Sequence, residues 1–386
     1  MVPPRNDCGV RIVLYRHLVE RAPFELHVAS QADFADDLLI HTKLELPWPV
    51  QRLRKSRFGP MFRRWIQDFE NLVWPVLGSR ALERAVDVFK PDVILTLAET
   101  GICHLAAKIA KRRGIPLAGL FLDWFPIMEP HFGHKLTQRI LSRRYRRLYK
   151  QCDLAICTSE GMKEVLGKHP NSHVIYPMPG KHTIPRKNYA PKNLKFRLVY
   201  VGASQGLYGR VLRSLLKKVK TSSIEFIIVG NTGDWEKKEK FEAIKNGNLL
   251  GFMPPKEAAK ILASADALLV VMSFEKNLKL FMKTSFTTKF LDYAAFEKPI
   301  VVWGPHFCSP CRFAERENSA LVVKTKSPLK LISSVIKLSK NTEELKRLTE
   351  ASKKLKKEKF NPENLQKIFV SEICKLQNRK KIVRQN

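Results

Sequence analysis

Short β-type runs alternate with helical segments along most of the chain, and this alternation constrains the fold more than any other feature. It is typical of parallel α/β folds, in which helices connect neighbouring strands. The predicted strands of the first half are 25–29, 92–97, 117–122, 154–158 and 173–176, and those of the second half are 197–201, 224–229, 248–250, 267–271, 300–302 and 320–323. The pattern predicts doubly wound α/β domains.

A break in this pattern divides the chain. Residues 177–195 are rich in Pro and Lys and have no periodicity, which is typical of a linker. At 386 residues the chain is long enough for two α/β domains, each with its own core. The predicted parts are an N-terminal domain, a linker, a C-terminal domain and a final helix with a basic tail, at 1–180, 181–195, 196–355 and 356–386.

The beginning of the chain lacks a feature that a doubly wound domain normally has, a buried first strand. Residues 3–11 instead read as the loop that follows such a strand. Two alternatives remain open: the first strand is missing, or the start is internal to a longer protein. Met1 is not followed by a signal peptide, and no apolar run reaches the roughly 18 residues that span a bilayer. We therefore expect a cytoplasmic protein, either soluble or peripheral on the inner face of the cell membrane.

The charge balance is strongly basic, with 69 Lys and Arg against 36 Asp and Glu. Nucleic acid, an anionic membrane face and an anionic substrate are the three partners that explain such an excess. Two segments, 51–67 and 135–150, mix basic and apolar residues in a way that suits an amphipathic helix on anionic lipid. The simpler alternative is that their apolar residues pack on the protein itself. The predicted membrane or acceptor contacts are Arg52, Arg54, Lys55, Arg57, Arg63, Arg64, Trp65, Arg139, Arg143 and Arg147.

The seven cysteines are scattered, and most lie beside apolar runs, as reduced core cysteines do. Cys308 and Cys311 form a single CxxC pair. A zinc site needs a second pair of ligands at suitable spacing, and the sequence has none. We therefore predict no metal site.

Three glycine-containing turns of the C-terminal domain each follow a predicted strand. Glycine lets the backbone approach a ligand closely, and a helix N-terminus offers N–H donors to phosphate. A bare structural turn is an equal alternative for the first of them, since its spacing matches neither GxGxxG nor a P-loop. The predicted nucleotide-binding residues of these turns are Gly202, Gly206, Gly209 and Arg210, then Gly230, then Phe252 and Met253.

The segment 284–302 adds a hydroxyl-rich turn, a basic residue and an acid to a helix that precedes an apolar strand. N–H groups at a helix N-terminus suit a phosphate, and an acid one turn later suits a ribose diol. Together they predict a nucleotide at the carboxyl edge of a parallel sheet. The residues are Ser285, Thr287, Thr288, Lys289 and Asp292.

The order of these pieces resembles the GT-B glycosyltransferases, specifically glycosyltransferase family 4. The resemblance implies two Rossmann-like domains facing a cleft, with Asp292 on the ribose and Thr287 and Thr288 by the diphosphate. It also implies a nucleotide-sugar donor and transfer with retention. Two positions depart from the family pattern, because Asp292 replaces a Glu and Thr287 replaces a Pro.

The segments 92–126 and 152–166 of the N-terminal domain also look like this family, and they imply an acceptor side. Asp123 follows the strand 117–122, and Glu99 follows the strand 92–97. We predict both carboxylates as catalytic residues. Lys289 and Arg210 are the predicted cations for the leaving diphosphate, whose developing charge needs N–H groups and cations. No DxD motif occurs, so no cofactor and no obligatory metal are expected.

The predicted activity is a hexosyltransferase-type, nucleotide-sugar-dependent transfer to a glycan or lipid-linked acceptor in cell-envelope polysaccharide or glycolipid synthesis. Its partners are the donor, the acceptor and an anionic membrane surface. Two alternatives stay open. One is a GT-B relative that has lost catalysis, and the other is a basic α/β protein that binds nucleic acid. No RRM, KH, helix-turn-helix or zinc-finger signature supports the last of these, and we expect no nucleic acid partner.

Overall fold

The computed structural model describes residues 3–5, 9–21, 24–33, 39–127, 135–180, 195–219 and 223–385. The chain forms two compact units. Unit 1 comprises Met1–Pro177, Thr284–Phe286 and Glu363–Asn386, and unit 2 comprises Met178–Lys283 and Thr287–Pro362. Apart from Lys195, the predicted linker 181–195 lies outside the described residues.

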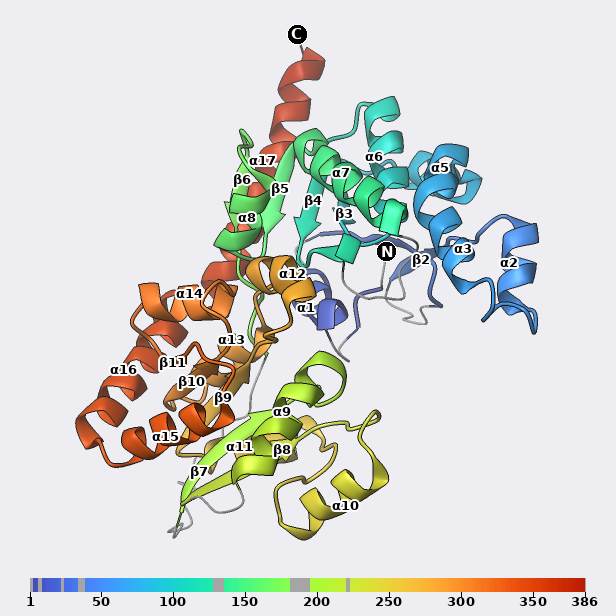
Figure 1. Cartoon of the computed structure of the whole chain (residues 1–386). Coiled ribbons are helices and arrows are strands. Elements are labelled where there is room, and N and C mark those ends of the chain that lie inside the picture. Colours follow the sequence, from blue (N-terminus) through green and yellow to red (C-terminus); the bar gives the residue numbers. More distant parts are fainter. Residues whose placement is uncertain are drawn as a thin grey trace. The chain divides into compact units, whose positions relative to one another are not determined.

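Unit 1 contains a parallel sheet of order β3-β4-β5-β6. Figure 1 shows these four strands side by side, with α17 alongside β5 and β6. The elements of unit 1 are α1 (Gly9–Leu18), β1 (His27–Ser30), β2 (Ile40–Lys43), α2 (Trp48–Lys55), α3 (Arg63–Asp68), the π-helical turn η1 (Phe69–Val73), α4 (Trp74–Leu77), α5 (Arg80–Phe89), β3 (Ile94–Leu97), α6 (Ile102–Arg113), β4 (Leu117–Phe121), the 3-10 turn η2 (Phe125–Ile127), α7 (Lys135–Gln151), β5 (Leu154–Cys157), α8 (Glu160–Leu166), β6 (Ser172–Val174) and α17 (Pro362–Gln385).

Local sequence signals explain where several of these elements begin and end. Ser159 caps α8 by accepting a hydrogen bond from the Met162 backbone N–H. Gly114 ends α6 in the left-handed conformation, and Pro116 follows it. β4 and β5 are buried along their whole length, as apolar strands in the middle of a parallel sheet are.

The C-terminal helix α17 belongs to unit 1, although it is more than 180 residues away in sequence from β6. Its apolar residues Leu365, Phe369, Ile373 and Leu376 are buried in the same cluster as the residues of α1, β4 and β5. The sequence predicts a separate helix and basic tail at 356–386. The apolar stripe of α17 instead completes the core of unit 1, because an amphipathic helix is stable only where its apolar face is covered.

A separate pair of parallel strands, β1 and β2, lies in unit 1. Within the described residues β1 pairs only with β2, and β3 pairs only with β4. An apolar cavity of about 170 Å³ is lined by both β1 and β3 and by residues of α1, α5 and α6. β2 was not predicted, since its short run Ile-His-Thr-Lys is polar and not deeply buried.

Unit 2 contains a five-stranded parallel sheet of order β11-β10-β9-β7-β8. The chain passes from β7 to β8 on one side and then to β9 on the other side of β7. Its elements are β7 (Phe196–Val201), α9 (Gly206–Val219), β8 (Ile224–Val229), α10 (Lys237–Lys245), α11 (Pro255–Ala263), β9 (Ala267–Val271), the 3-10 turn η3 (Lys276–Leu278), α12 (Lys279–Thr284), α13 (Thr288–Ala294), β10 (Ile300–Trp303), α14 (Ser309–Arg316), β11 (Leu321–Val323), α15 (Pro328–Ser339) and α16 (Thr342–Glu358).

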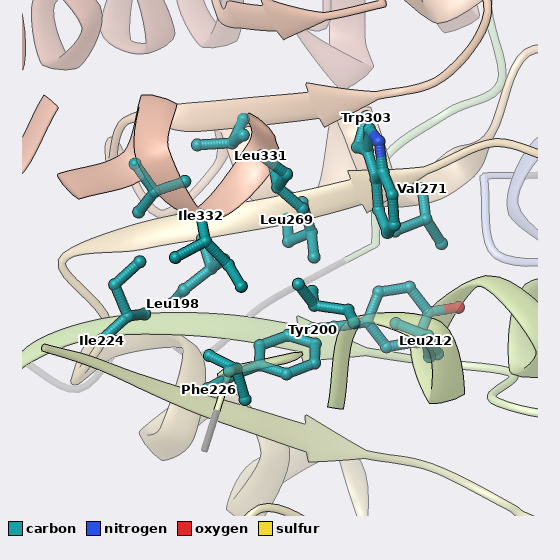
Figure 2. Packing of buried hydrophobic residues seen from close by; sticks show 14 of the residues in the cluster. Leu198, Tyr200, Leu212, Ile224, Phe226, Leu269, Val271, Trp303, Leu331 and Ile332 are labelled. Atoms are coloured by element: carbon teal, nitrogen blue, oxygen red, sulfur yellow. The ribbon is translucent and has the colours of Figure 1, made fainter. Parts of the chain in front are cut away.

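The strand order gives unit 2 a topological switch point between β7 and β9. In open parallel sheets, ligands bind beyond the carboxyl ends of the strands at such a point. In unit 2 the helices pack against the sheet through a hydrophobic core. Figure 2 shows its side chains, which come from strands and from helices α9 and α15: Leu198, Tyr200, Leu212, Ile224, Phe226, Leu269, Val271, Trp303, Leu331 and Ile332.

The predicted α/β class is confirmed, and most predicted strands lie within one or two residues of the observed ones. The predicted strand 248–250 is wrong as a sheet strand. Its single parallel bridge joins Leu249 to Ile228, and Gly247 and Gly251, both with positive φ, turn the backbone on either side of it. The CxxC cysteines Cys308 and Cys311 are fully buried at the start of α14.

Candidate functional site

Two carboxylates lie at the carboxyl edge of the unit 1 sheet. Leu97 of β3 lies opposite Leu120 of β4 in a parallel register. Glu99 and Asp123 each follow the end of their strand by two residues, so neighbouring strands deliver both side chains to the same edge. The sequence predicted each residue from its position after a strand, and the register brings the two strand ends together.

Burial raises the proton affinity of both carboxylates. Burial, and to a lesser degree the nearby charge of Asp123, raises the pKa of Glu99 from 4.5 to about 8. Burial also raises the pKa of Asp123, and the Ser285 hydroxyl acts against this increase. Glu99 therefore keeps its proton at neutral pH. A carboxyl group that stays protonated at neutral pH can donate a hydrogen bond to a ligand.

Neighbouring side chains hold this edge in place. The Tyr145 hydroxyl of α7 donates a 2.8 Å hydrogen bond to the Asp123 carbonyl oxygen. Ser159, after β5, donates a 2.6 Å hydrogen bond to the Thr284 carbonyl oxygen. This contact brings Thr284–Phe286 to unit 1, where Ser285 interacts with Asp123. The predicted donor-binding residue Ser285 is thus assigned to a different unit from Thr287, Thr288, Lys289 and Asp292.

A polar cavity of about 550 Å³ lies next to this edge in unit 1. Its walls come from α2, from β2 and from the loop that carries Thr100, the neighbour of Glu99 in sequence. Basic side chains line it together with two acids, so it suits a polar and partly anionic group. The charged lining residues are Arg11, Asp33, Lys43, Glu45, Arg54 and Lys55.

The high pKa of Glu99 predicts a pH-dependent stability. Between pH 4.5 and about 8 the unfolded chain ionises Glu99, whereas the folded chain keeps the proton. Unfolding therefore releases a proton in this range, and the free energy of unfolding decreases as the pH rises. Glutamine does not titrate in this range. The free energy of unfolding of the Glu99→Gln variant, relative to that of the wild type, should therefore increase by about 3 kcal/mol from pH 5 to pH 8. Urea unfolding at several pH values measures this, and parallel curves for the two proteins would contradict the assignment.

Glycines allow a close approach of the two turns that follow β7 and β8 in unit 2. Gly202 follows β7 with φ +135°, and Gly230 follows β8 with φ +159°. A Cβ atom at Gly230 would lie 1.9 Å from the Gly202 carbonyl oxygen, and one at Gly202 would lie 2.4 Å from Cε of Lys289. The missing side chains thus leave room for the two turns and for the lysine.

Lys289 lies at this close approach, in the first turn of α13. Its ammonium group lies 5.4 Å from the ring centroid of Tyr200 and 4.9 Å from that of Tyr208, which are favourable cation–π distances. Burial lowers the pKa of Lys289 from 10.5 to about 8, and the charge of Asp292 acts in the opposite direction. An ammonium group that has lost part of its hydration suits an anionic ligand, whose charge would offset that loss.

Asp292 lies on the same helix, one turn after Thr288. Its Oδ1 accepts a 2.9 Å hydrogen bond from the Gly180 backbone N–H. Thr287 is the N-cap residue of α13 through its backbone, without a side-chain capping bond, and Thr288 is the first helical residue. The helix that the sequence predicted therefore carries the predicted lysine and acid together.

At the first turn of α9, a backbone N–H group already has a hydrogen-bond acceptor within the protein. The Gly206 backbone N–H donates a 2.8 Å hydrogen bond to Oδ2 of Asp234. A Cβ atom at Gly209 would lie 2.5 Å from the Ser204 carbonyl oxygen, so this glycine serves the packing of the turn. Arg210 forms a 2.7 Å ion pair with Glu275, which follows β9. A phosphate at this turn would have to compete with Asp234.

The predicted base-binding residues lie after the bridge residue Leu249. Phe252 is 80% exposed and Met253 is half-buried. Leu250 N–H and Gly230 N–H form hydrogen bonds with Ile228 and Gly251 carbonyl oxygens, so this loop is anchored to β8. An exposed aromatic ring on an anchored loop is available to stack on a flat base.

The predicted basic contact residues lie in two places of unit 1. Those of 51–67 are exposed on α2, on the loop after it and on α3. Arg139, Arg143 and Arg147 are exposed on α7, whose apolar residues Leu141 and Tyr145 are buried. The apolar face of α7 packs on the protein, which is the simpler of the two alternatives for that helix.

Sequence reasoning missed several residues of these two edges. Tyr208, whose ring faces Lys289, lies inside the glycine-rich turn, so its position in GLYG was an available signal. Three further contacts join residues far apart in sequence, and no local pattern indicates them. They are Asp234 with Gly206, Gly180 with Asp292 and Ser159 with Thr284, separated by 28, 112 and 125 residues.

In the part of the chain that the structure describes, no group of three or more His, Cys, Asp or Glu side chains is arranged to hold a metal ion. No described helix is both long and apolar enough to cross a bilayer.

Two models of glycosyltransferase families match this chain. The model of Glycosyltransferase Family 4 matches residues 12–178, and the model of Glycosyl transferases group 1 matches residues 207–355. The chain belongs to the GT-B glycosyltransferases. The two models cover unit 1 up to its last strand and most of unit 2, so the family resemblance indicated by the motifs is confirmed.

Solved structures of GT-B proteins have the same fold at low sequence identity. HepE of Anabaena, solved with UDP and glucose, is 13% identical, with a TM-score of 0.65 over 97% of each chain. Sucrose-phosphate synthase from Thermosynechococcus elongatus is 11% identical, with a TM-score of 0.63 over 95% of this chain and 92% of the other. WaaG, a glycosyltransferase of lipopolysaccharide biosynthesis, is 13% identical, with a TM-score of 0.57 over 93% and 95%. No curated protein sequence matches the chain.

Proposed function

We propose that this protein transfers a hexose, with retention, from a nucleotide sugar to a glycan or lipid-linked acceptor in the synthesis of a cell-envelope polysaccharide or glycolipid. The observation that carries the proposal is the half-buried Lys289 beside the glycine turn that follows β7, with Asp292 on the same helix, α13. A cation and an acid at this spacing suit the diphosphate and the ribose of one nucleotide.

On the donor side, Lys289 stabilises the negative charge that develops on the diphosphate when the bond to the sugar breaks. The backbone N–H groups at the start of α13 add donors, because Thr287 and Thr288 leave them without side-chain caps. Asp292 binds the ribose hydroxyls, and Phe252 stacks on the base. With these groups the transfer needs no obligatory divalent metal and no cofactor.

On the acceptor side, Asp123 orients the attacking hydroxyl at the carboxyl edge of unit 1. Glu99 is protonated at neutral pH and donates a hydrogen bond to the sugar or to the acceptor. The polar cavity that reaches Thr100 admits the charged part of the acceptor. HepE, solved with UDP and glucose, and WaaG, a glycosyltransferase of lipopolysaccharide biosynthesis, support a nucleotide-sugar donor and an envelope acceptor.

The departures at Asp292 and Thr287 favour one second candidate, a GT-B relative that binds a nucleotide sugar without transferring it. Asp292 is one methylene shorter than the Glu of the family, and it is also engaged by Gly180. Both candidates bind the donor, so binding and transfer must be measured separately.

Thermal unfolding of the full chain with a panel of UDP-, GDP- and ADP-sugars tests the donor. A bound ligand stabilises the folded state by mass action, by about 2.7 kcal/mol at a hundred times its dissociation constant. We expect one nucleotide to raise the unfolding temperature and the others to leave it unchanged. If none of them raises it and none is hydrolysed, the proposal is overturned.

A further inference from the structure

The segment from Trp48 to Trp65, here called the α2–α3 surface, exposes an unusual set of large apolar side chains. Trp48, Met61 and Trp65 are 68%, 69% and 64% exposed, and Phe58 and Phe62 are exposed as well. Isolated exposed apolar residues are common in proteins, but a group of five within one short stretch marks an interaction surface.

The same surface is positively charged throughout. It contains six exposed basic residues and no acid: Arg52, Arg54, Lys55, Arg57, Arg63 and Arg64. Arg54 approaches Glu70 at 3.9 Å, and within the described part of the chain the other five have no acidic partner at ion-pair distance. Arg52 and Arg57 instead lie over the rings of Trp48 and Phe58, at 5.2 and 4.7 Å. The basic and apolar groups therefore form one mixed surface.

We propose that the α2–α3 surface docks on an anionic lipid bilayer, with its apolar side chains inserted at the level of the head groups and its basic side chains on lipid phosphates. Trp and Arg side chains with an apolar body and a polar end suit this boundary. Met61 and Phe62 lie at the turn before α3, where apolar side chains without hydrogen-bonding groups favour lipid over nucleic acid.

The place of this surface in unit 1 links it to the acceptor. Figure 1 shows α2 and α3 on the side of β2, away from β5 and β6. Arg54 and Lys55 belong to the α2–α3 surface and also line the polar cavity that reaches Thr100. Docking would thus bring the head-group layer next to the carboxylate edge. The inference goes beyond the proposed function, and vesicle binding is measured without any sugar donor.

Sedimentation of the full chain with vesicles tests the inference. The vesicles contain phosphatidylcholine, either alone or with one third of phosphatidylglycerol. Two variants probe the two interactions: Met61→Ser/Trp65→Ser for insertion and Arg52→Gln/Lys55→Gln/Arg57→Gln for charge. The matched controls lie on α10, where Phe241 and Ile244 are similarly exposed and Lys237, Lys238 and Lys240 are basic. They are Phe241→Ser/Ile244→Ser and Lys237→Gln/Lys238→Gln/Lys240→Gln.

We expect binding to the anionic vesicles that weakens with salt. The charge variant should lose roughly a hundredfold in partition, at about fivefold per basic residue. The insertion variant should lose about tenfold or more per residue and keep its salt dependence. The controls should bind as the wild type does. Equal binding by all variants overturns the inference, and so does absence of binding to the anionic vesicles. Tight, salt-sensitive binding of single-stranded or duplex DNA in that case would assign the surface to nucleic acid instead.

Discussion

Replacing Lys289 by methionine is expected to abolish donor binding and, at the same time, to make the protein more stable. The half-buried Lys289 lies beside two tyrosine rings, and the loss of hydration there lowers its pKa to about 8. At pH 7 the folded chain therefore holds an ammonium group at a cost that methionine does not have. We expect the free energy of unfolding to rise by about 2 kcal/mol and donor affinity to fall at least a hundredfold.

The opposite signs of these two effects distinguish a binding residue from a structural one. Unfolding in urea and calorimetric titration with the nucleotide sugar measure them on the same sample. Lys260→Met on α11 is the matched control, because Lys260 is exposed and pairs with Glu257. It should change neither quantity appreciably. A Lys289→Met variant that is less stable and binds the donor as the wild type does would assign the lysine to packing alone.

The wild type should show the corresponding pH dependence. The folded-state pKa of Lys289 is lowered, so between pH 8 and 10.5 the unfolded chain binds a proton that the folded chain does not. The free energy of unfolding should therefore rise with pH across this range, relative to the methionine variant. Donor affinity should fall above pH 8, as the ammonium group loses its charge.

Asp123→Asn is expected to lower the turnover of transfer about a thousandfold while leaving donor affinity within a factor of about two. Asp123 lies in unit 1, whereas Lys289 and Asp292 lie in unit 2, so its loss should affect the acceptor step. Removing a group that orients and deprotonates a reacting hydroxyl typically costs 10² to 10⁴ in rate. Steady-state kinetics with both substrates varied, together with donor titration, separate the two effects.

A matched substitution exists at the other end of the same strand. Asp153 accepts a 2.8 Å hydrogen bond from the Leu117 backbone N–H, at the amino end of β4. Asp153→Asn should leave turnover nearly unchanged and cost only a modest amount of stability. If Asp123→Asn behaves in the same way as Asp153→Asn, the carboxylate edge of unit 1 is not where the reaction occurs.

Features that depend on a few neighbouring residues are predicted well from the sequence. Strand and helix periodicity, the Ser159 and Gly114 helix ends and the apolar runs of the parallel strands all act over a few residues. They fixed the α/β class and the strand ends that carry Glu99 and Asp123. Family motifs then placed Lys289 and Asp292 on one helix, which the structure describes as α13.

Contacts across long stretches of chain were beyond that reasoning. Nothing near Pro362 indicates that the apolar stripe of α17 is buried with α1 and β4, more than 200 residues away. Nothing near Gly206 indicates that Asp234 occupies its backbone N–H. The high pKa of Glu99 likewise depends on burial and on a neighbour from another strand. Such features follow from the register of the sheet, which a linear pattern does not specify.

The release of nucleoside diphosphate from a nucleotide sugar, measured with and without acceptor, tests the central claim most directly. The wild type, Asp292→Asn and Asp292→Glu should be compared at pH 7 with the nucleotide sugar that stabilises the protein. Asn keeps an acceptor for the Gly180 N–H, and Glu restores the residue of the family. The account predicts release by the wild type, at least a hundredfold loss with Asn, and recovery with Glu. Equal rates in the wild type and Asp292→Asn, or no release with any donor that binds, would contradict it.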